Sequence, residues 1–249
     1  DSLAYVRGQG SRAEITVQSA SLAIPLDDEE RESPRDERYL NFSDVTGRLT
    51  FEPDAVTVVL TGQWREGTCT LDGRITADPG AIRSLDDIGF TLQLEARNIL
   101  LPAQPDDRTP AEERFVKRWS KVSVICRHYD PIGRVDLLLS LAKEAGRGND
   151  IEFHGGQLIS RGASAAFFRF PYRLEDVTGT VHFEADGRVR LDTLTGRHGS
   201  ARVTVNGTLT SARWDSGASL QIEGTNVALD EALLSCLSEK YRTIWRMFA

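Results

Sequence analysis

Apolar and polar residues alternate along much of the chain with a period of two. In segment 177–183 the apolar residues Val177, Val181 and Phe183 are separated by even numbers of positions. The polar residues Thr178 and His182 lie between them. Because successive side chains of a strand point to opposite faces, this period predicts strands with one apolar and one polar face. Short glycine-containing segments such as 185–187 separate the runs and favour hairpins between antiparallel neighbours.

The alternating pattern occurs twice in the sequence. The tetrapeptide Asp-Val-Thr-Gly at 44–47 recurs at 176–179. Further matches follow in the same order, pairing 48–52 with 180–184, 71–76 with 205–210, and 94–99 with 222–227. Ordered matches over one span are hard to produce by chance, so the sequence predicts two copies of one structural unit.

One helix is predicted after each copy. The first is capped by Thr109 and ends near Trp119, and the second is capped by Asp230 and ends near Trp245. A turn at 130–133 and a strand follow the first helix. We therefore expect two domains: residues 1–145 with the first β-meander, its helix and the following strand, and residues 146–249 with the second meander and helix, truncated at its C-terminus.

The expected fold is mainly β, an elongated, twisted antiparallel sheet of two repeats that forms a groove, with one helix after each repeat. The apolar face of such a sheet must be covered by a second sheet, a helix or a ligand. A single curved sheet would leave a trough that suits acyl chains, because each buried methylene contributes about 0.8 kcal/mol without a polar contact. The candidate lipid-binding residues are the apolar positions of both copies: Leu49, Phe51, Val58, Leu60, Leu92, Leu94, Val181, Phe183, Val189, Leu191, Val203, Val205, Leu220 and Ile222. Plain core packing explains each of them individually as well, and the helices could fill the trough.

Charge and cysteine content narrow the functional classes. The formal net charge is −7, and an acidic chain is a poor candidate for nucleic acid, which is bound through clustered cations. The three cysteines, Cys69, Cys126 and Cys236, are far apart and lack metal-site spacing. We interpret them as small buried residues, with one disulfide as the alternative.

The sequence carries no recognisable active site. Cys126 and His128 could share one face of a strand, but no third metal ligand is evident, so we expect no metal site and no cofactor. The acid pairs at 86–87 and 106–107 need a cleft that sequence cannot show. No Gly-x-Ser-x-Gly elbow occurs. We therefore predict no catalytic residue and no enzyme, with a carbohydrate-active β-solenoid as a distant alternative.

The stretch 170–179, Phe-Pro-Tyr-Arg-Leu-Glu-Asp-Val-Thr-Gly, resembles the recurring strand of AsmA-like and TamB-like envelope proteins. The segments 196–199 and 205–207 fit the same pattern, whereas the first copy at 39–47 lacks the Phe-Pro-Tyr part. The resemblance spans most of residues 13–249 and rests on strands and turns. It implies a long β-groove with an apolar inner face. It also implies that this segment is periplasmic and belongs to a parent protein that is anchored in the inner membrane outside this segment.

The resemblance also implies a function. We expect a segment of a bacterial envelope protein that holds or conducts phospholipid along the groove between inner and outer membranes. Its expected partners are phospholipid acyl chains and envelope proteins, and not nucleic acid. The alternative is an envelope assembly scaffold that binds protein partners through exposed sheet edges, without lipid.

Overall fold

The computed structural model describes most of the chain. The described residues are 3–9, 12–25, 39–64, 66–76, 87–101, 113, 129–147, 151–167, 170–211, 217–228, 230–237 and 239–245. The first predicted helix, from Thr109 to near Trp119, lies outside them apart from residue 113, as do Cys126 and His128.

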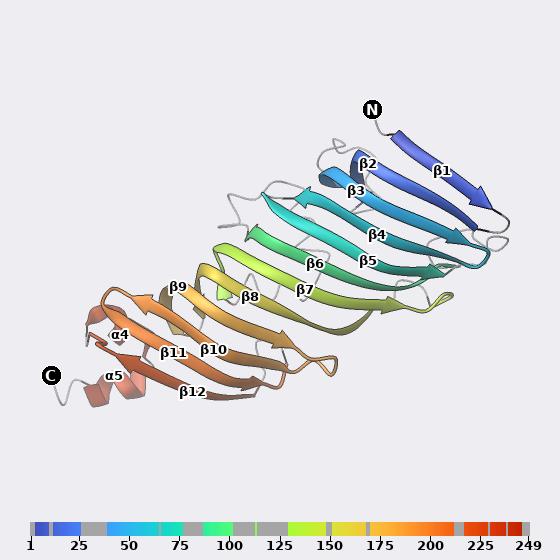
Figure 1. The fold of residues 1–249 in the computed structure, drawn as a ribbon. Helices are drawn as coiled ribbons and strands as arrows, with labels where there is room; N and C mark the ends of the chain where they lie inside the picture. Colours follow the sequence, from blue (N-terminus) through green and yellow to red (C-terminus); the bar gives the residue numbers. More distant parts are fainter. Residues whose placement is uncertain are drawn as a thin grey trace.

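Twelve strands form a single sheet in which each strand pairs with the next along the chain (Figure 1). All eleven pairings are antiparallel. The strands are β1 (Leu3–Gln9), β2 (Arg12–Pro25), β3 (Tyr39–Glu52), β4 (Ala55–Trp64), β5 (Gly67–Thr76), β6 (Gly89–Leu101), β7 (Gly133–Lys143), β8 (Glu152–Phe167), β9 (Phe170–Phe183), β10 (Val189–His198), β11 (Ala201–Leu209) and β12 (Ala218–Thr225). The prediction of a mainly β, antiparallel protein is confirmed.

The repeat seen in the sequence is also a repeat of backbone conformation. Asp44 and Asp176 both adopt positive φ, of 50° and 49°, and Asn98 and Asn226 do so at 58° and 54°. Aspartate and asparagine tolerate this left-handed region better than most residues. Strands β3 to β6 therefore correspond to β9 to β12. The proposed boundary at 145/146 falls in the turn between β7 and β8, which pair with each other, so the sheet continues across it.

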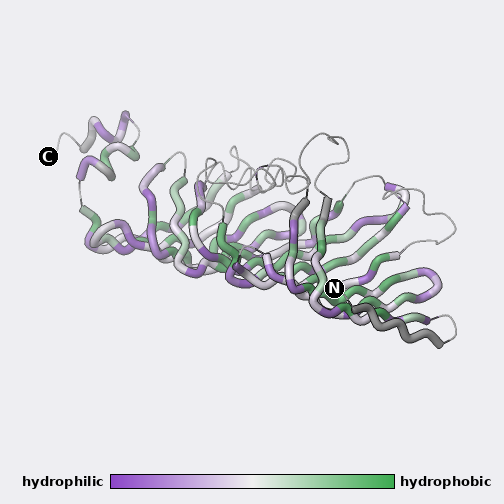
Figure 2. Tube along the Cα trace, turned by 90° about the horizontal axis from the view of Figure 1, so that it is seen from above, coloured by the Kyte–Doolittle hydropathy of each residue, from purple (hydrophilic) through white to green (hydrophobic). Residues whose placement is uncertain are grey.

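β-Bulges bend the strands, so that the sheet is curved. The pairing register shifts at bulges in β2, β3, β6, β8, β9 and β10. An extra residue on one strand increases local twist and bends that strand. Figure 2 shows the result: the strands turn upward from the floor of the sheet instead of lying flat. We call the side toward which they bend the inner face and the opposite side the outer face.

Two short helices follow β12 where one was predicted. These are α4 (Glu231–Cys236) and α5 (Glu239–Trp245). Asp230 caps α4 as predicted, because its carboxylate accepts a hydrogen bond from the Leu233 amide at 3.0 Å. The single helix is wrong because Leu237 adopts an extended conformation, with ψ of 146°. Arg242 stabilises this break by donating from Nε to the Leu237 carbonyl at 2.8 Å.

The molecule is elongated and exposes much of its surface (Figure 1). Its accessible area is 15718 Å², whereas a compact protein of this size exposes roughly 11,000 Å². Among the described residues, no large side chain is fully buried. In the part of the chain that the structure describes, all twelve strands belong to one open sheet and no second sheet packs on it.

Candidate functional site: the inner face of the sheet

The pairing register places an unbroken row of apolar residues across the inner face. The row crosses β2 to β12 through pairs that face each other directly: Val17, Gly47, Leu60, Leu71, Leu94, Leu139, Gly156, Phe183, Val189, Leu209 and Ala218. Facing residues of an antiparallel pair share one face. With strands about 4.8 Å apart, this row is roughly 48 Å long.

The neighbouring row on the outer face is polar at nearly every strand. From β3 to β12 it contains Thr46, Thr61, Thr70, Glu95, Leu138, Gln157, His182, Arg190, Thr208 and Ser219. The two faces therefore differ in chemistry along the whole sheet, and Figure 2 shows the apolar residues distributed from end to end.

All fourteen candidate lipid-binding residues lie on the inner face. In the first copy, Leu49 faces Val58 and Phe51 faces Val56, while Leu60, Leu92 and Leu94 face residues of β5. In the second copy the same face holds three pairs, Val181 with Leu191, Phe183 with Val189, and Val205 with Ile222, together with Val203 and Leu220. The alternation in the sequence correctly predicted which residues share a face. That they bind lipid stays a prediction.

Most of these side chains are neither sealed nor fully exposed. Val58, Val189 and Val203 are buried, at 4%, 4% and 8% exposure. Leu220 and Ile222, on the terminal strand β12, are 42% and 63% exposed. The other nine are half-buried. A sheet stacked under a second sheet would bury most of its inner residues, so this distribution is that of a partly open groove.

The sequence-based candidate set omitted the middle of the groove. Leu137, Leu139 and Leu141 of β7 line the inner face beside β6, and Leu158 of β8 faces Leu137. The signal was present, because these leucines alternate with Asp136 and Ser140, but β7 lies between the two copies and has no counterpart among the matched segments. Leu71 and Ile75 of β5 were missed although they alternate in the same way.

Two buried polar residues on the inner face are satisfied by the backbone. The ammonium of Lys143, at the end of β7, donates to the Ile88 carbonyl at 3.0 Å. The hydroxyl of Ser160 donates to the Val177 carbonyl at 2.5 Å. Neither residue interrupts the apolar row, and a buried polar group with a partner avoids the cost of an unpaired one.

Helix α4 covers one part of the groove. Cys236 and, partly, Leu233 of α4 pack on Tyr172 of β9 and Val203 of β11. Figure 2 shows α4 and α5 above the sheet at its C-terminal end. A candidate lipid residue, Val203, is therefore covered by protein, and the expectation that a helix could fill part of the trough is confirmed at this end.

A corresponding cluster lies in the first copy. Cys69, Ala96 and Ile99 are buried there, with Phe42 and Trp64 packed against them. Burial raises the pKa of the Cys69 thiol to about 11, so this cysteine stays protonated and behaves as an apolar residue. The interpretation of Cys69 and Cys236 as small buried residues is confirmed; Cys126 lies outside the described residues.

His198 packs against a tyrosine on the inner face. It ends β10 on the inner face, where its ring lies 4.0 Å from that of Tyr172, and its Nδ1 lies 2.8 Å from the Arg173 carbonyl oxygen. Burial and the nearby carboxylate of Asp230 raise the pKa of Tyr172. His182 lies on the outer face, 3.7 Å from Asp192.

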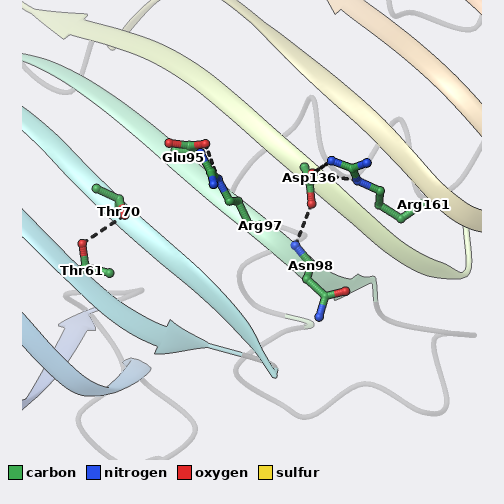
Figure 3. A network of polar contacts seen from close by, with 7 residues as sticks. All are labelled: Thr61, Thr70, Glu95, Arg97, Asn98, Asp136 and Arg161. Carbon is green, nitrogen blue, oxygen red and sulfur yellow. Dashed lines mark hydrogen bonds and ion pairs between the residues drawn. The ribbon is translucent and has the colours of Figure 1, made fainter.

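Polar contacts hold neighbouring strands together on the outer face (Figure 3). The carboxylate of Asp136 in β7 accepts two hydrogen bonds, each 2.8 Å long. The donors are the backbone N–H of Asn98 in β6 and Nε of Arg161 in β8. Partial burial acts to raise the pKa of Asp136, but these two hydrogen bonds and the positive charges of Arg161 and Arg97 hold it below its usual value. Arg97 itself pairs with Glu95 at 2.6 Å.

A threonine pair recurs at equivalent places in the two copies. The hydroxyl oxygens of Thr61 and Thr70 are 3.1 Å apart, and those of Thr195 and Thr204 are 3.2 Å apart (Figure 3 shows the first pair). A cross-strand threonine pair stabilises a sheet by about 0.2–1 kcal/mol. The outer-face contacts among the described residues link neighbouring strands.

No metal-binding cluster of three or more His, Cys, Asp or Glu residues occurs within the described part of the chain. No helix among the described residues is long and apolar enough to cross a membrane. No family model, curated protein or solved structure matches the chain.

Proposed function

We propose that the chain is a segment of a bacterial envelope protein that holds or conducts phospholipid along the inner face of its sheet. One observation carries the proposal: an apolar row crosses eleven strands without a polar interruption, and most of the candidate side chains beside it remain accessible. An acyl chain gains from contact with such a surface wherever it lies, because apolar burial has no preferred direction. A bound lipid can therefore move along the row without breaking specific bonds.

The location is part of the same proposal. A surface of this length is useful where an acyl chain must cross water between two membranes, so we place the segment in the periplasm, in a parent protein anchored in the inner membrane. The partners proposed are phospholipid acyl chains, with envelope proteins as additional contacts. The chemistry needs no catalytic residue and no cofactor, because transfer along the groove breaks no covalent bond.

Two matched pairs of substitutions test the proposal. Leu94 and Leu139 face each other on the inner face, whereas Val59 and Leu138 lie on the outer face. We expect Leu94→Gln with Leu139→Gln to lower co-purifying phospholipid about tenfold, since a buried leucine contributes roughly 1.5–3 kcal/mol. Val59→Gln with Leu138→Gln should leave it unchanged. Native purification, lipid extraction and mass spectrometry measure the effect.

Circular dichroism and thermal melting show whether both double variants retain the sheet. Equal phospholipid in all three proteins, or none in the unmodified protein, would contradict the proposal. Loss of phospholipid from the outer-face variant alone would reverse the assignment of the two faces.

A further inference from the structure

Helix α4 rests on a part of the inner face that carries candidate lipid-binding residues. Leu233 and Cys236 of α4 belong to one packed cluster with Tyr172 of β9 and with Val203 and Val205 of β11. Cys236 and Val203 are each 8% exposed, so little water reaches this contact. The helix therefore occupies apolar surface of the same kind as that of the open groove.

The covered surface continues directly into the open groove. Two residues beyond Val205 on β11, Gly207 faces Leu191 of β10, and Leu191 in turn faces Val181 of β9. Leu191 and Val181 are half-buried. Because two residues of a strand span roughly 7 Å, an acyl chain on these side chains lies within its own length of the α4 contact. It can extend onto Val205 only where α4 gives way.

The surface beneath α4 includes a buried polar group. Tyr172 is 7% exposed, and among the described residues its hydroxyl has no hydrogen-bond partner. The ring itself is held by the sheet, with its centroid 4.0 Å from that of His198 and 6.0 Å from that of Phe170. Burial raises the pKa of the hydroxyl, and so does the electrostatic effect of Asp230 and Cys236. The hydroxyl therefore lies near the helix that covers it.

This hydroxyl makes the α4 contact weaker than its apolar side chains suggest. A hydroxyl that leaves water without gaining a hydrogen bond is unfavourable. That cost is present while α4 covers Tyr172, and when the helix lifts, the hydroxyl can bond to water again. Helix α4 also has only six residues, and so short a helix has little stability apart from its contacts. The cover is therefore easily opened.

We propose that α4 is a displaceable cover of the groove. An acyl chain that reaches Val203 and Val205 takes the place of Leu233 and Cys236, and α4 lifts from the sheet. The inference rests on the proposed function and adds how the second copy admits lipid. The exchange replaces one apolar contact by another, which is possible because apolar burial depends on area and not on specific bonds. It also gives the Tyr172 hydroxyl a hydrogen-bond partner, either water or an ester oxygen of the lipid.

Replacement of Tyr172 by phenylalanine tests whether the buried hydroxyl weakens the cover. Tyr172→Phe keeps the ring and removes the hydroxyl, so α4 should open less often. We expect Cys236 to react with a water-soluble maleimide about fivefold more slowly than in the unmodified protein. Tyr241→Phe is the matched control and should leave the rate unchanged, because Tyr241 of α5 is 57% exposed. An equal or faster Cys236 reaction in Tyr172→Phe would overturn the proposal.

Lipid itself provides the second test. Diheptanoyl phosphatidylcholine, added below its critical micelle concentration, should accelerate the Cys236 reaction at least about fivefold. It should leave Cys69 unchanged, because Cys69 is buried among residues of the strands. In a parallel sample, a photoreactive amino acid in place of Leu94 reports phospholipid bound to the first copy.

The two readouts separate this inference from the proposed function. Phospholipid captured at Leu94, together with a faster Cys236 reaction, supports both. Capture at Leu94 with an unchanged or slower Cys236 reaction would overturn the displacement of α4 and leave the proposed function standing. No capture at Leu94 and an unchanged Cys236 reaction would overturn both.

Discussion

At the scale of single residues, glycines allow adjacent strands to approach on the inner face. A Cβ atom on Gly207 would lie 2.1 Å from the carbonyl oxygen of Ser219, and one on Gly47 would lie 2.0 Å from that of Val59. Both residues also adopt positive φ, of 140° and 144°. Only glycine avoids both the clash and the strained backbone, so neither position accepts another residue without distortion.

Gly207→Ala is therefore expected to destabilise the second copy. A side chain in this backbone region costs about 1–3 kcal/mol, and the carbonyl of Ser219 must also shift. Gly217→Ala is the control, because its Cβ would meet nothing nearer than 3.4 Å and its effect should be within about 0.5 kcal/mol. Urea denaturation followed by circular dichroism compares the two; equal stabilities would show that the strands are not this close.

Asp136 gives a pH-dependent contribution to stability. Its folded pKa lies below the usual value, so its contribution is present above the unfolded pKa of about 3.9 and is lost as the pH falls through the folded pKa. We expect Asp136→Asn to lower the free energy of unfolding by about 1 kcal/mol at pH 7. Below pH 4 the stability of this variant should decline less steeply than that of the unmodified protein. Denaturation at a series of pH values measures this; parallel curves for both proteins would contradict it.

At the scale of elements, sequence periodicity predicted the strands well because most of them alternate apolar residues on the inner face with polar residues on the outer face. The meander, strand β7 and the cap of α4 at Asp230 were all predictable from local signals. The turn predicted at 130–133 is shorter than expected, because Ile132 pairs with Ser164 and Gly133 already belongs to β7. The break at Leu237 was not predictable, because Leu233, Leu234 and Leu237 fit one helical stripe. What ends α4 is Arg242 reaching back to the Leu237 carbonyl, a contact that helical spacing does not reveal.

The sequence predicted which residues share the inner face, but not which of them are covered by other parts of the protein. Alternation assigns Val203 and Leu220 to the same side equally well, yet Val203 lies beneath α4 and Leu220 lies at a sheet edge. Their difference depends on contacts between distant parts of the chain. The contact of His198 with Tyr172 is of the same kind, since the two residues come from different strands.

The α4 cover should open when its cap is removed. Asp230→Ala loses the hydrogen bond to the Leu233 amide, which costs about 1 kcal/mol of helix stability. We expect Cys236 to react with a thiol reagent about fivefold faster, because 1 kcal/mol changes an opening equilibrium by that factor. Peptide mass spectrometry follows each cysteine. Cys69, in the other cluster, is the internal control; an unchanged Cys236 rate would show that the cap does not hold α4 on the sheet.

At the scale of the whole molecule, the described residues are held together chiefly by pairing between neighbouring strands. Each strand pairs with its neighbours in the sequence, and the buried clusters around Cys69 and around Cys236 are small and separate. Such a sheet is quasi-one-dimensional, like other repeat proteins. This arrangement leaves the inner face accessible and gives it length, the two properties that the proposed function needs.

The elongated shape is directly measurable. A compact protein of this length has a radius of gyration of about 18 Å. Small-angle X-ray scattering, extrapolated to zero concentration, should give a clearly larger value with the asymmetric distance distribution of an extended body. A value near that of a globule would show that the sheet closes on itself in solution and buries the inner face.

The central claim, an inner face that contacts acyl chains, is tested most directly by site-specific photo-crosslinking. A photoreactive amino acid replaces Leu60, Leu94 or Phe183 on the inner face, or the adjacent Val59, Gln93 or His182 on the outer face. With labelled phospholipid present, the account predicts capture at the three inner positions and little at the three outer ones. Equal capture on both faces, or capture at none, would contradict it.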